Sequence, residues 1–318
     1  MPIMIARRDA ILAVLLALPV SGAGIALAQS GGTAPKPVGD EAELQATIRK
    51  SNAYTALMNR TLRAVQSWER YRSWVDMQRG PTGRERYISY GLYSLYDVTS
   101  EIARAEEAIN QEPALSGLDD VVRRYIQAYQ ALAPLITRAE RYYERKDYRD
   151  DNMAEGRALH GQMVPAAAAF LRDRAELDEQ MRVFRTDLDA RELTSIERRE
   201  GKSARWQIRN IMVSARAVMD LMPSNENPVV NLAAFEAAVS RYAAAVREMD
   251  RFKETDPQGV SMIDSHASSW LGKLRDFRDK IARSRGDVRR GAASDANWIV
   301  NQYNMMVSMA DTAMRMPR

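Results

Sequence analysis

The stretch VSMIDSHASSWLGKLRDFRDKI, residues 260–281, carries the clearest structural pattern in the chain. Its apolar positions step by three and four residues in alternation, and they are Val260, Ile263, Ala267, Trp270, Leu274, Phe277 and Ile281. This spacing places all of these side chains on one face of an α-helix. Burying the large ones is worth about 12 kcal/mol in total, whereas ordering roughly twenty backbones costs about 1–2 kcal/mol each. The helix therefore needs partner helices that cover this seam.

The same helical period continues through the chain after Asp40, and no stretch shows a convincing alternating strand pattern. The predicted helices are residues 40–77, 83–111, 118–146, 152–222, 229–253, 257–285 and 294–314. The fourth is the longest, with a bend expected at Gly161 or Pro165 and an interruption at Gly201. In the first, the residues expected to face inward are Leu44, Ile48, Leu62, Val65, Trp68, Tyr71 and Val75. The sequence thus predicts an all-α fold, an elongated bundle of about seven helices with a long central helix.

Three segments are expected. Residues 1–28 have the pattern of a signal peptide, in which Arg7 and Arg8 precede an apolar run and Ala26-Leu27-Ala28 offers a small-x-small cleavage site. Residues 29–39 have linker composition, and residues 40–318 form the helical bundle. A division into two bundles that share the long helix, near residues 190–205, is the alternative. A retained membrane anchor at residues 10–28 is the alternative to cleavage.

Composition excludes several kinds of site. The chain has no cysteine and two histidines, which rules out disulfides, thiolate metal sites and multi-histidine metal centres. Its formal charge is +4, and removal of residues 1–28 leaves 44 basic and 41 acidic residues, or +3. Because both signs are interspersed, a nucleic-acid partner is not expected. No GxSxG, Walker or HExxH motif occurs, so no catalytic residues and no cofactor are predicted.

A charged corner, Arg141–His160, joins the third and fourth predicted helices. Cations at the end of one helix and carboxylates before the next suit the two helix dipoles, and Asn152 with Glu155 fits a capping box. The spacing does not align His160 with Asp151 or Glu155. Methionines form two further clusters, which are Met219 and Met222, and Met305, Met306, Met309, Met314 and Met316. Their spacing suits a buried helix face, although thioethers can also bind Cu(I).

Tyrosines recur at every third residue in RERYISYGLYSLYD, at positions 87, 90, 93 and 96. If this stretch is helical, its core face consists of Ile88, Leu92, Leu95, Thr99 and Ile102. Tyr90 and Tyr93 then lie on the opposite side, where they pack on a second helix or stack on a sugar or peptide. Gly91 would let another group approach the backbone closely.

The segments YYERKDYRDDNMAEGRALH (residues 142–160) and NAYTALMNRTLRAVQSWERYRSWVD (residues 52–76) resemble the YiiG-like family of uncharacterised bacterial envelope proteins. The resemblance extends loosely over residues 45–315. It implies an exported and mostly helical protein, and it brings no known activity or catalytic residues. Many members of the family look like lipoproteins, but this chain lacks the cysteine to which a lipid would be attached.

We therefore predict a periplasmic, non-enzymatic protein that binds or organises an envelope component, either a protein or a glycan. Membrane association is expected only through an uncleaved N-terminal segment. The residues predicted to contact the ligand or partner are Tyr90, Tyr93, Tyr142, Tyr143, Asp147, Tyr148 and Asp151. The alternatives are a periplasmic metal-binding protein, which would use the carboxylate corner or the methionine clusters, and a hydrolase of unrecognised type.

Overall fold

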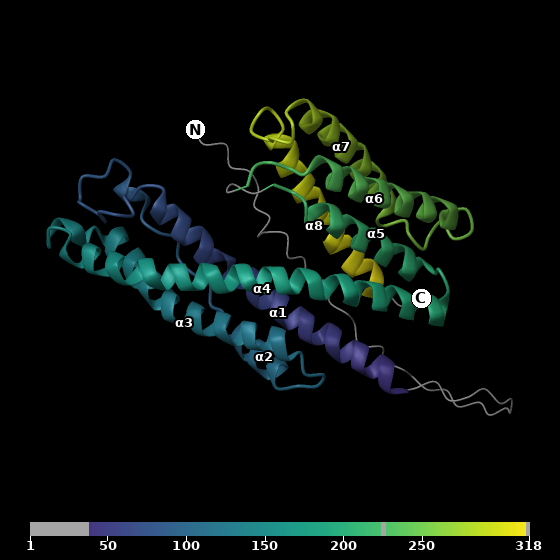
Figure 1. Cartoon of the computed structure of the whole chain (residues 1–318), viewed down its shortest axis with the longest axis horizontal. Helices are drawn as coiled ribbons and strands as arrows, with labels where there is room; N and C mark the ends of the chain where they lie inside the picture. Colours follow the sequence, from purple (N-terminus) through teal and green to yellow (C-terminus); the bar gives the residue numbers. More distant parts are fainter. Residues whose placement is uncertain (1–37, 224–226, 316–318) are drawn as a thin grey trace. The chain divides into compact units, whose positions relative to one another are not determined.

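The computed structural model describes residues 38–223 and 227–315, which contain eight α-helices and no β-strand (Figure 1). This confirms the all-α prediction. The helices are α1 (Val38–Arg72), α2 (Thr99–Ile109), α3 (Ser116–Arg145), α4 (Ala154–Glu200), α5 (Ala204–Met219), α6 (Leu232–Lys253), α7 (Asp264–Arg283) and α8 (Ala293–Arg315). Short 3₁₀ turns, η2 (Ile88–Tyr90) and η3 (Asp147–Arg149), add to them. The expected signal peptide, residues 1–28, lies outside the described residues, as does the linker up to residue 37.

The chain packs as two compact units. Unit 1 contains the chain up to residue 45 and from residue 187 onward, and unit 2 contains residues 46–186. The change of unit therefore falls inside α1 and inside α4.

In unit 1, α5, α6, α7 and α8 form a closed set of four helices, in which each helix packs against two of the others (Figure 1). All seven residues of the predicted 260–281 seam are buried in their shared core, which confirms that prediction. Two hydrogen bonds fix the aromatic residues there: Trp270 Nε1 donates to the carbonyl of Ile299 (3.0 Å), and the Tyr242 hydroxyl donates to that of Ala267 (3.1 Å).

Gly201, with φ of +67°, separates α4 from α5, as the sequence predicts. A left-handed backbone angle suits glycine at a helix end, and Ser203 caps the start of α5 by accepting a hydrogen bond from the Trp206 amide. Buried Asp189 then ties the two helices together through ion pairs to Arg209 (2.7 Å) and Arg216 (2.8 Å).

In unit 2, three long helices meet around Tyr125 of α3. Its hydroxyl accepts a hydrogen bond from Arg174 of α4 (2.9 Å) and pairs with the hydroxyl of Thr61 of α1. Arg174 also donates to the Met58 carbonyl on α1 (3.0 Å), and the ring of Tyr125 stacks on Phe170 of α4. The seven inward residues predicted for the first helix are all buried, which confirms its orientation.

The helix predicted over residues 83–111 is wrong in its first half. The first helix ends at Arg72 rather than near residue 77, α2 begins only at Thr99, and residues 91–98 have no regular secondary structure. Of the expected core face only Leu92 is buried, while Ile88, Leu95 and Ile102 are half-buried and Thr99 is exposed. This segment carries the candidate site.

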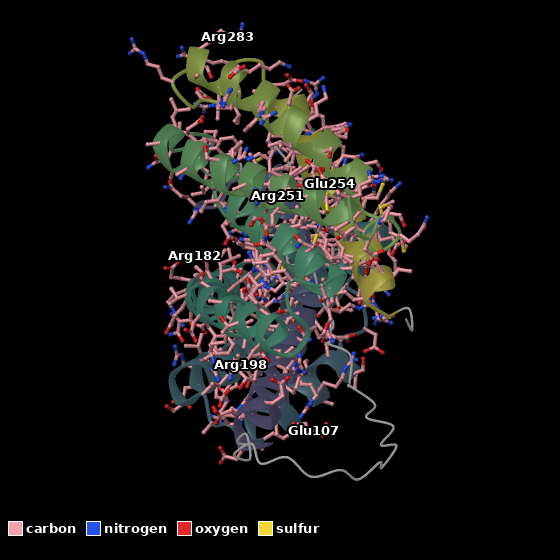
Figure 2. All side chains as sticks on the ribbon, turned by 90° about the vertical axis from the view of Figure 1, so that its right-hand side faces the viewer. Glu107, Arg182, Arg198, Arg251, Glu254 and Arg283 are labelled. Carbon is pink, nitrogen blue, oxygen red and sulfur yellow. The ribbon has the colours of Figure 1, made fainter. Side chains whose placement is uncertain are left out.

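Charged side chains of both signs cover the outer faces of the helices (Figure 2). Arg182 and Arg198 on α4, and Arg251 and Glu254 at the end of α6, are examples that lie exposed. Within residues 38–223 and 227–315, no helix is both long and apolar enough to cross a bilayer.

Candidate functional site

A segment without α-helix, residues 90–97, runs antiparallel along α1 and is held there by side chains. The donors lie at alternating spacings of three and four residues, and they are Arg60, Arg63, Ser67, Arg70 and Trp74. They reach the carbonyl oxygens of Asp97 (2.9 Å), Ser94 (3.2 Å), Tyr93 (3.0 Å), Tyr90 (2.6 Å) and Gly91 (3.0 Å), respectively. Because main-chain carbonyl groups need donors in a packed structure, this stripe of side chains replaces the hydrogen bonds that a helix would supply.

The same arginines stack with the tyrosines of the segment. Following the contacts gives the order Arg60, Tyr96, Arg63, Tyr93, Arg70, Tyr90, Tyr87 and Arg86, and these eight residues are called the Arg–Tyr ladder below. Guanidinium carbons lie 4.1–5.7 Å from the ring centroids, and the rings of Tyr87 and Tyr90 stack at 5.1 Å. Such cation–π contacts are worth about 0.5–1 kcal/mol each at exposed sites.

Helix geometry explains the fit. Arg63 and Arg70 are seven residues apart, a rise of about 10.5 Å along α1, and three residues of extended chain span about 10 Å. Tyrosines at every third position can therefore alternate with these arginines. Arg63 and Arg70, two helical turns apart, both stack on Tyr93, with guanidinium carbons 4.1 and 4.2 Å from its ring centroid.

Gly91 makes the bend into the segment, with φ of 53° and ψ of −139°. This conformation is open to glycine and costly for other residues. A Cβ atom at Gly91 would lie 3.5 Å from the Cβ of Tyr143. The close approach expected at this glycine is therefore made by Tyr143 and Trp74 of the same chain.

The ladder lies in a part of the chain that is rich in positive charge. Residues 46–98 contain nine basic and four acidic residues, a net charge of +5, against +4 for the whole chain. Among the described residues, no carboxylate lies within ion-pair distance of the four ladder arginines. The nearby carboxylates have other hydrogen-bond donors: Asp97 accepts from Thr99, Glu85 accepts from Thr82 and Gly83, and Glu140 accepts from Ser94.

The predicted contact residues of the charged corner, Arg141–His160, divide into a buried and an accessible part. Tyr142 and Tyr143 are buried, in a cluster with Tyr71 and Trp74. Burial raises the pKa of Tyr71 and of Tyr143 far above the usual value, so both are neutral at physiological pH. His160 belongs to the same cluster, with Nδ1 3.0 Å from the Tyr71 hydroxyl. The sequence does not reveal that Tyr142 and Tyr143 are core residues.

Asp151, rather than the predicted Asn152, caps α4. Its carboxylate accepts from the amides of Met153 and Glu155, both at 2.9 Å, and from the Tyr142 hydroxyl at 2.8 Å. The amide of Glu155 is the main cause of a pKa for Asp151 below its usual range. Asn152 cannot act as the cap because it adopts a left-handed conformation, with φ of 51°, and Glu155 pairs with Arg138.

Gly156 allows the packing of this corner. A Cβ atom there would meet the Met153 sulfur at 2.5 Å, and it would lie 3.1 Å from both the Tyr142 ring and the Tyr143 hydroxyl. Of the remaining predicted contacts, Asp147 pairs with Arg145 (2.6 Å) and Tyr148 is half-buried against Tyr142 and Tyr143. Only Tyr90 and Tyr93 among the predicted residues belong to the Arg–Tyr ladder.

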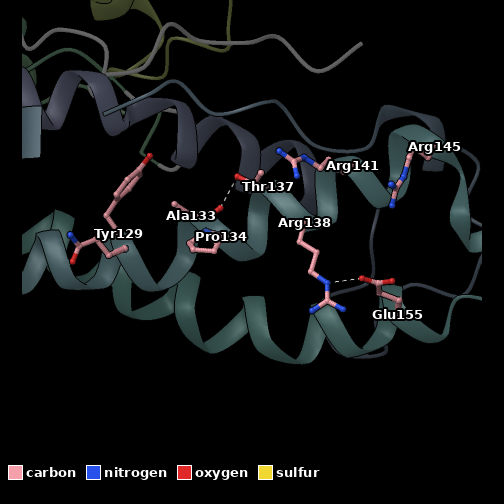
Figure 3. Close-up of a pocket in the computed structure, with 9 residues that line it drawn as sticks. Tyr129, Ala133, Pro134, Thr137, Arg138, Arg141, Arg145 and Glu155 are labelled. Carbon is pink, nitrogen blue, oxygen red and sulfur yellow. Dashed lines mark hydrogen bonds and ion pairs between the residues drawn. The ribbon is translucent and has the colours of Figure 1, made fainter. Parts of the chain in front are cut away.

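A shallow groove of about 750 Å³ runs along α3 (Figure 3). Tyr129 lies at one end, and Arg145 lies with Glu155 at the other. Arg138 reaches across to Glu155 (2.6 Å), and Arg145 is paired as described above. Arg141 is the third arginine of the groove, and it has no ion-pair partner among the described residues. The groove therefore offers far less open positive charge than the ladder.

The other sites considered from sequence do not assemble. Within the described part of the chain, no three carboxylate or histidine side chains lie close enough to hold a metal ion. Asp264 pairs with Lys253 rather than with His266. Met219, Met222 and Met306 are buried in the core of unit 1, and Met316 lies outside the described residues.

Helices α1–α8 and the ladder define an all-helical protein that displays a fixed cationic and aromatic surface. The chain belongs to the family described as "Protein of unknown function (DUF3829)", whose model matches residues 45–310. It is 29% identical over 295 residues to the "Uncharacterized protein YiiG" of Escherichia coli (strain K12). The matched region covers 86% of this chain and 81% of that protein. These findings confirm the resemblance to the YiiG-like family. No solved structure gives a significant match.

Proposed function

We propose that this protein is an exported, non-enzymatic component of the bacterial cell envelope, and that the Arg–Tyr ladder is the surface through which it binds another envelope component. The carrying observation is that the four ladder arginines have no carboxylate partner among the described residues, although each is held in place by stacking or hydrogen bonds. Elsewhere in unit 2, exposed arginines such as Arg123 and Arg182 pair with neighbouring carboxylates.

Fixing an arginine side chain in advance favours binding, because less rotamer entropy remains to be lost. The planar guanidinium group of arginine also matches the geometry of carboxylates and phosphates. Three of the ladder tyrosines, Tyr87, Tyr90 and Tyr96, are 42–50% exposed, so a partner can reach the ladder along its length. The signal-peptide pattern of residues 1–28 supports the export part of the proposal.

The first test is cell fractionation of the full chain expressed in a bacterium. We expect the protein in the periplasmic fraction and partly sedimenting with envelope material. Recovery in the cytoplasm would refute export, and recovery as an integral membrane protein would favour the anchor at residues 10–28 instead.

The second test compares the Y90A/Y96A variant with the wild type in the same sedimentation. Both tyrosines are about half exposed, so the helical circular dichroism signal should stay unchanged while envelope retention falls. Tyr148→Ala is the control, because Tyr148 lies outside the ladder. Equal retention of the Y90A/Y96A variant and the wild type would refute the ladder as the binding surface.

A further inference from the structure

We infer that the ligand of the ladder is an acidic polysaccharide, a linear chain on which carboxylate groups alternate with hydroxyl groups. This inference rests on the proposed function and names the chemistry of its ligand. It is carried by three properties of the ladder: the direction of its donors, their alternation, and the absence of exposed aliphatic side chains around them.

The donors of the ladder are directed in a consistent way. The Nε atoms of Arg60, Arg63 and Arg70 are used internally, on the carbonyl oxygens of the segment. Apart from a weak contact of Arg63 with Gln66 (3.3 Å), their terminal nitrogens have no protein acceptor among the described residues. Two terminal N–H groups on one guanidinium can bind both oxygens of a carboxylate.

The backbone adds donors of its own. Five carbonyl groups of the segment accept from side chains of residues 60–74, and the amide groups of Ser94, Leu95 and Tyr96 have no hydrogen-bond partner among the described residues. Backbone N–H groups of this kind favour anionic or neutral oxygen acceptors. The segment therefore supplies backbone donors beside the arginines, and two nearby carboxylates already accept hydrogen bonds, Asp97 from Thr99 and Glu140 from Ser94.

The alternation along the ladder fits a chain with two kinds of group. A guanidinium only donates hydrogen bonds, whereas a phenol hydroxyl both donates and accepts. The hydroxyls of Tyr90, Tyr93 and Tyr96 have no partner among the described residues. Carboxylates suit the first kind of position, and sugar hydroxyls suit the second. From Arg60 to Arg70 the ladder follows α1 for about 15 Å, which is too long for a single small anion.

A membrane surface is a poorer fit. Peripheral proteins bind bilayers by burying apolar residues such as Trp, Phe or Leu below the headgroups. In the described part of unit 2, the large apolar side chains that are clearly exposed are Tyr87, Tyr90, Tyr96 and Val183. The three tyrosines are stacked into the ladder, and Val183 lies on α4. The ladder arginines therefore have no exposed aliphatic side chain beside them that could enter a bilayer.

The test is fluorescence anisotropy of the full chain with labelled alginate oligosaccharides, in which every sugar carries a carboxylate. Dextran, poly-L-glutamate and phosphatidylglycerol vesicles serve as comparison probes. We expect binding to alginate that weakens as sodium chloride rises from about 0.05 to 0.5 M, because salt screens exposed charges. Dextran should not bind, and poly-L-glutamate should bind at least tenfold more weakly because it lacks hydroxyl groups.

Two variants localise the binding. The R60Q/R63Q/R70Q variant should bind alginate at least tenfold more weakly, since each charged hydrogen bond lost is worth a severalfold change in Kd. The control R104Q/R123Q/R182Q removes the same charge from arginines of unit 2 that pair with nearby carboxylates, and it should change Kd less than twofold. The Y90F/Y93F/Y96F variant keeps the rings, so it should keep its melting temperature while its Kd rises about threefold or more.

Each other outcome overturns the inference. Equal binding of poly-L-glutamate would show that any acidic chain suffices, and binding of the vesicles alone would identify an anionic membrane as the ligand. Equal affinity of the ladder and control arginine variants would place alginate elsewhere on the protein. If alginate fails to bind while envelope retention still requires Tyr90 and Tyr96, the ligand assignment falls and the proposed function stands.

Discussion

Replacing the buried Lys50 should destabilise unit 2 selectively. Its ammonium group donates three hydrogen bonds, to the carbonyl oxygens of Gln111 (2.9 Å) and Pro113 (3.0 Å) and to the carboxylate of Asp119 (2.8 Å). Asp119 also accepts from the hydroxyl of Tyr54 and from the amide just before α3. Lys50 thereby joins α1 to the turn between α2 and α3.

The size of the effect follows from burial. The Lys50 side chain is 2% exposed and that of Asp119 is 7% exposed. Removing one partner of a buried ion pair costs about 3–5 kcal/mol, because the other charge is left without compensation. Lys50→Met keeps the apolar stem and removes only the ammonium group, so we expect a loss in this range. Typical domains are stable by about 5–15 kcal/mol, so unit 2 would lose a large share of its stability.

Hydrogen exchange measured by mass spectrometry across a urea series can follow each unit by its own peptides. Peptides of α1 after residue 46 and of α3 should lose protection at lower urea in Lys50→Met, while those of α6 and α7 should not change. Adding Asp119→Asn removes the uncompensated charge, so the double variant should be about 1–3 kcal/mol more stable than the sum of the single effects predicts.

The control is Lys202→Met, which removes an exposed ion pair with Glu248 and should cost less than about 1 kcal/mol. A Lys50→Met loss below about 1 kcal/mol, or strict additivity with Asp119→Asn, would refute the view that this pair is energetically coupled.

Three further predictions follow from the site. Ser67→Ala should speed amide exchange in peptides covering residues 88–98, because the Ser67 hydroxyl both donates to and accepts from the main chain of Tyr93. Unchanged exchange would contradict the view that side chains of α1 hold this segment in place. Asp151→Asn should lower the melting temperature at pH 7, but not below the folded pKa of Asp151. That pKa is depressed, so the stabilisation is complete above about pH 4 and is lost as the pH falls further. Gly156→Ala should cost about 1–3 kcal/mol by overpacking. Gly161→Ala on the same helix, where a Cβ meets nothing within 4 Å, should gain about 0.5–1 kcal/mol; similar effects in urea denaturation would be inconsistent with the packing described.

Much of the fold can be predicted from the local spacing of apolar residues. The seam of residues 260–281 and the inward face of α1 follow from spacing alone, because each apolar stripe must be covered by a neighbour. Gly201 marks a helix end for an equally local reason, its left-handed backbone. These features need no knowledge of the rest of the chain.

The segment around Gly91 shows where local periodicity fails. Tyrosines three residues apart suggest a helical face, yet the hydrogen bonds that fix the backbone there come from α1 and the turn after it, 17 to 37 residues earlier. The pattern therefore points to Tyr90 and Tyr93 through a helix that does not form. Arg60, Arg63 and Arg70 of the ladder were missed, although their place in a stripe of donors spaced by three and four was a usable signal.

Residues 90–97 contain no α-helix or strand, and exposed loops are where proteases usually cut. A protease must draw several residues into its own cleft, which here would mean extracting five carbonyl groups from five separate side chains at once. These hydrogen bonds should therefore make this stretch resistant to digestion, unlike most exposed loops.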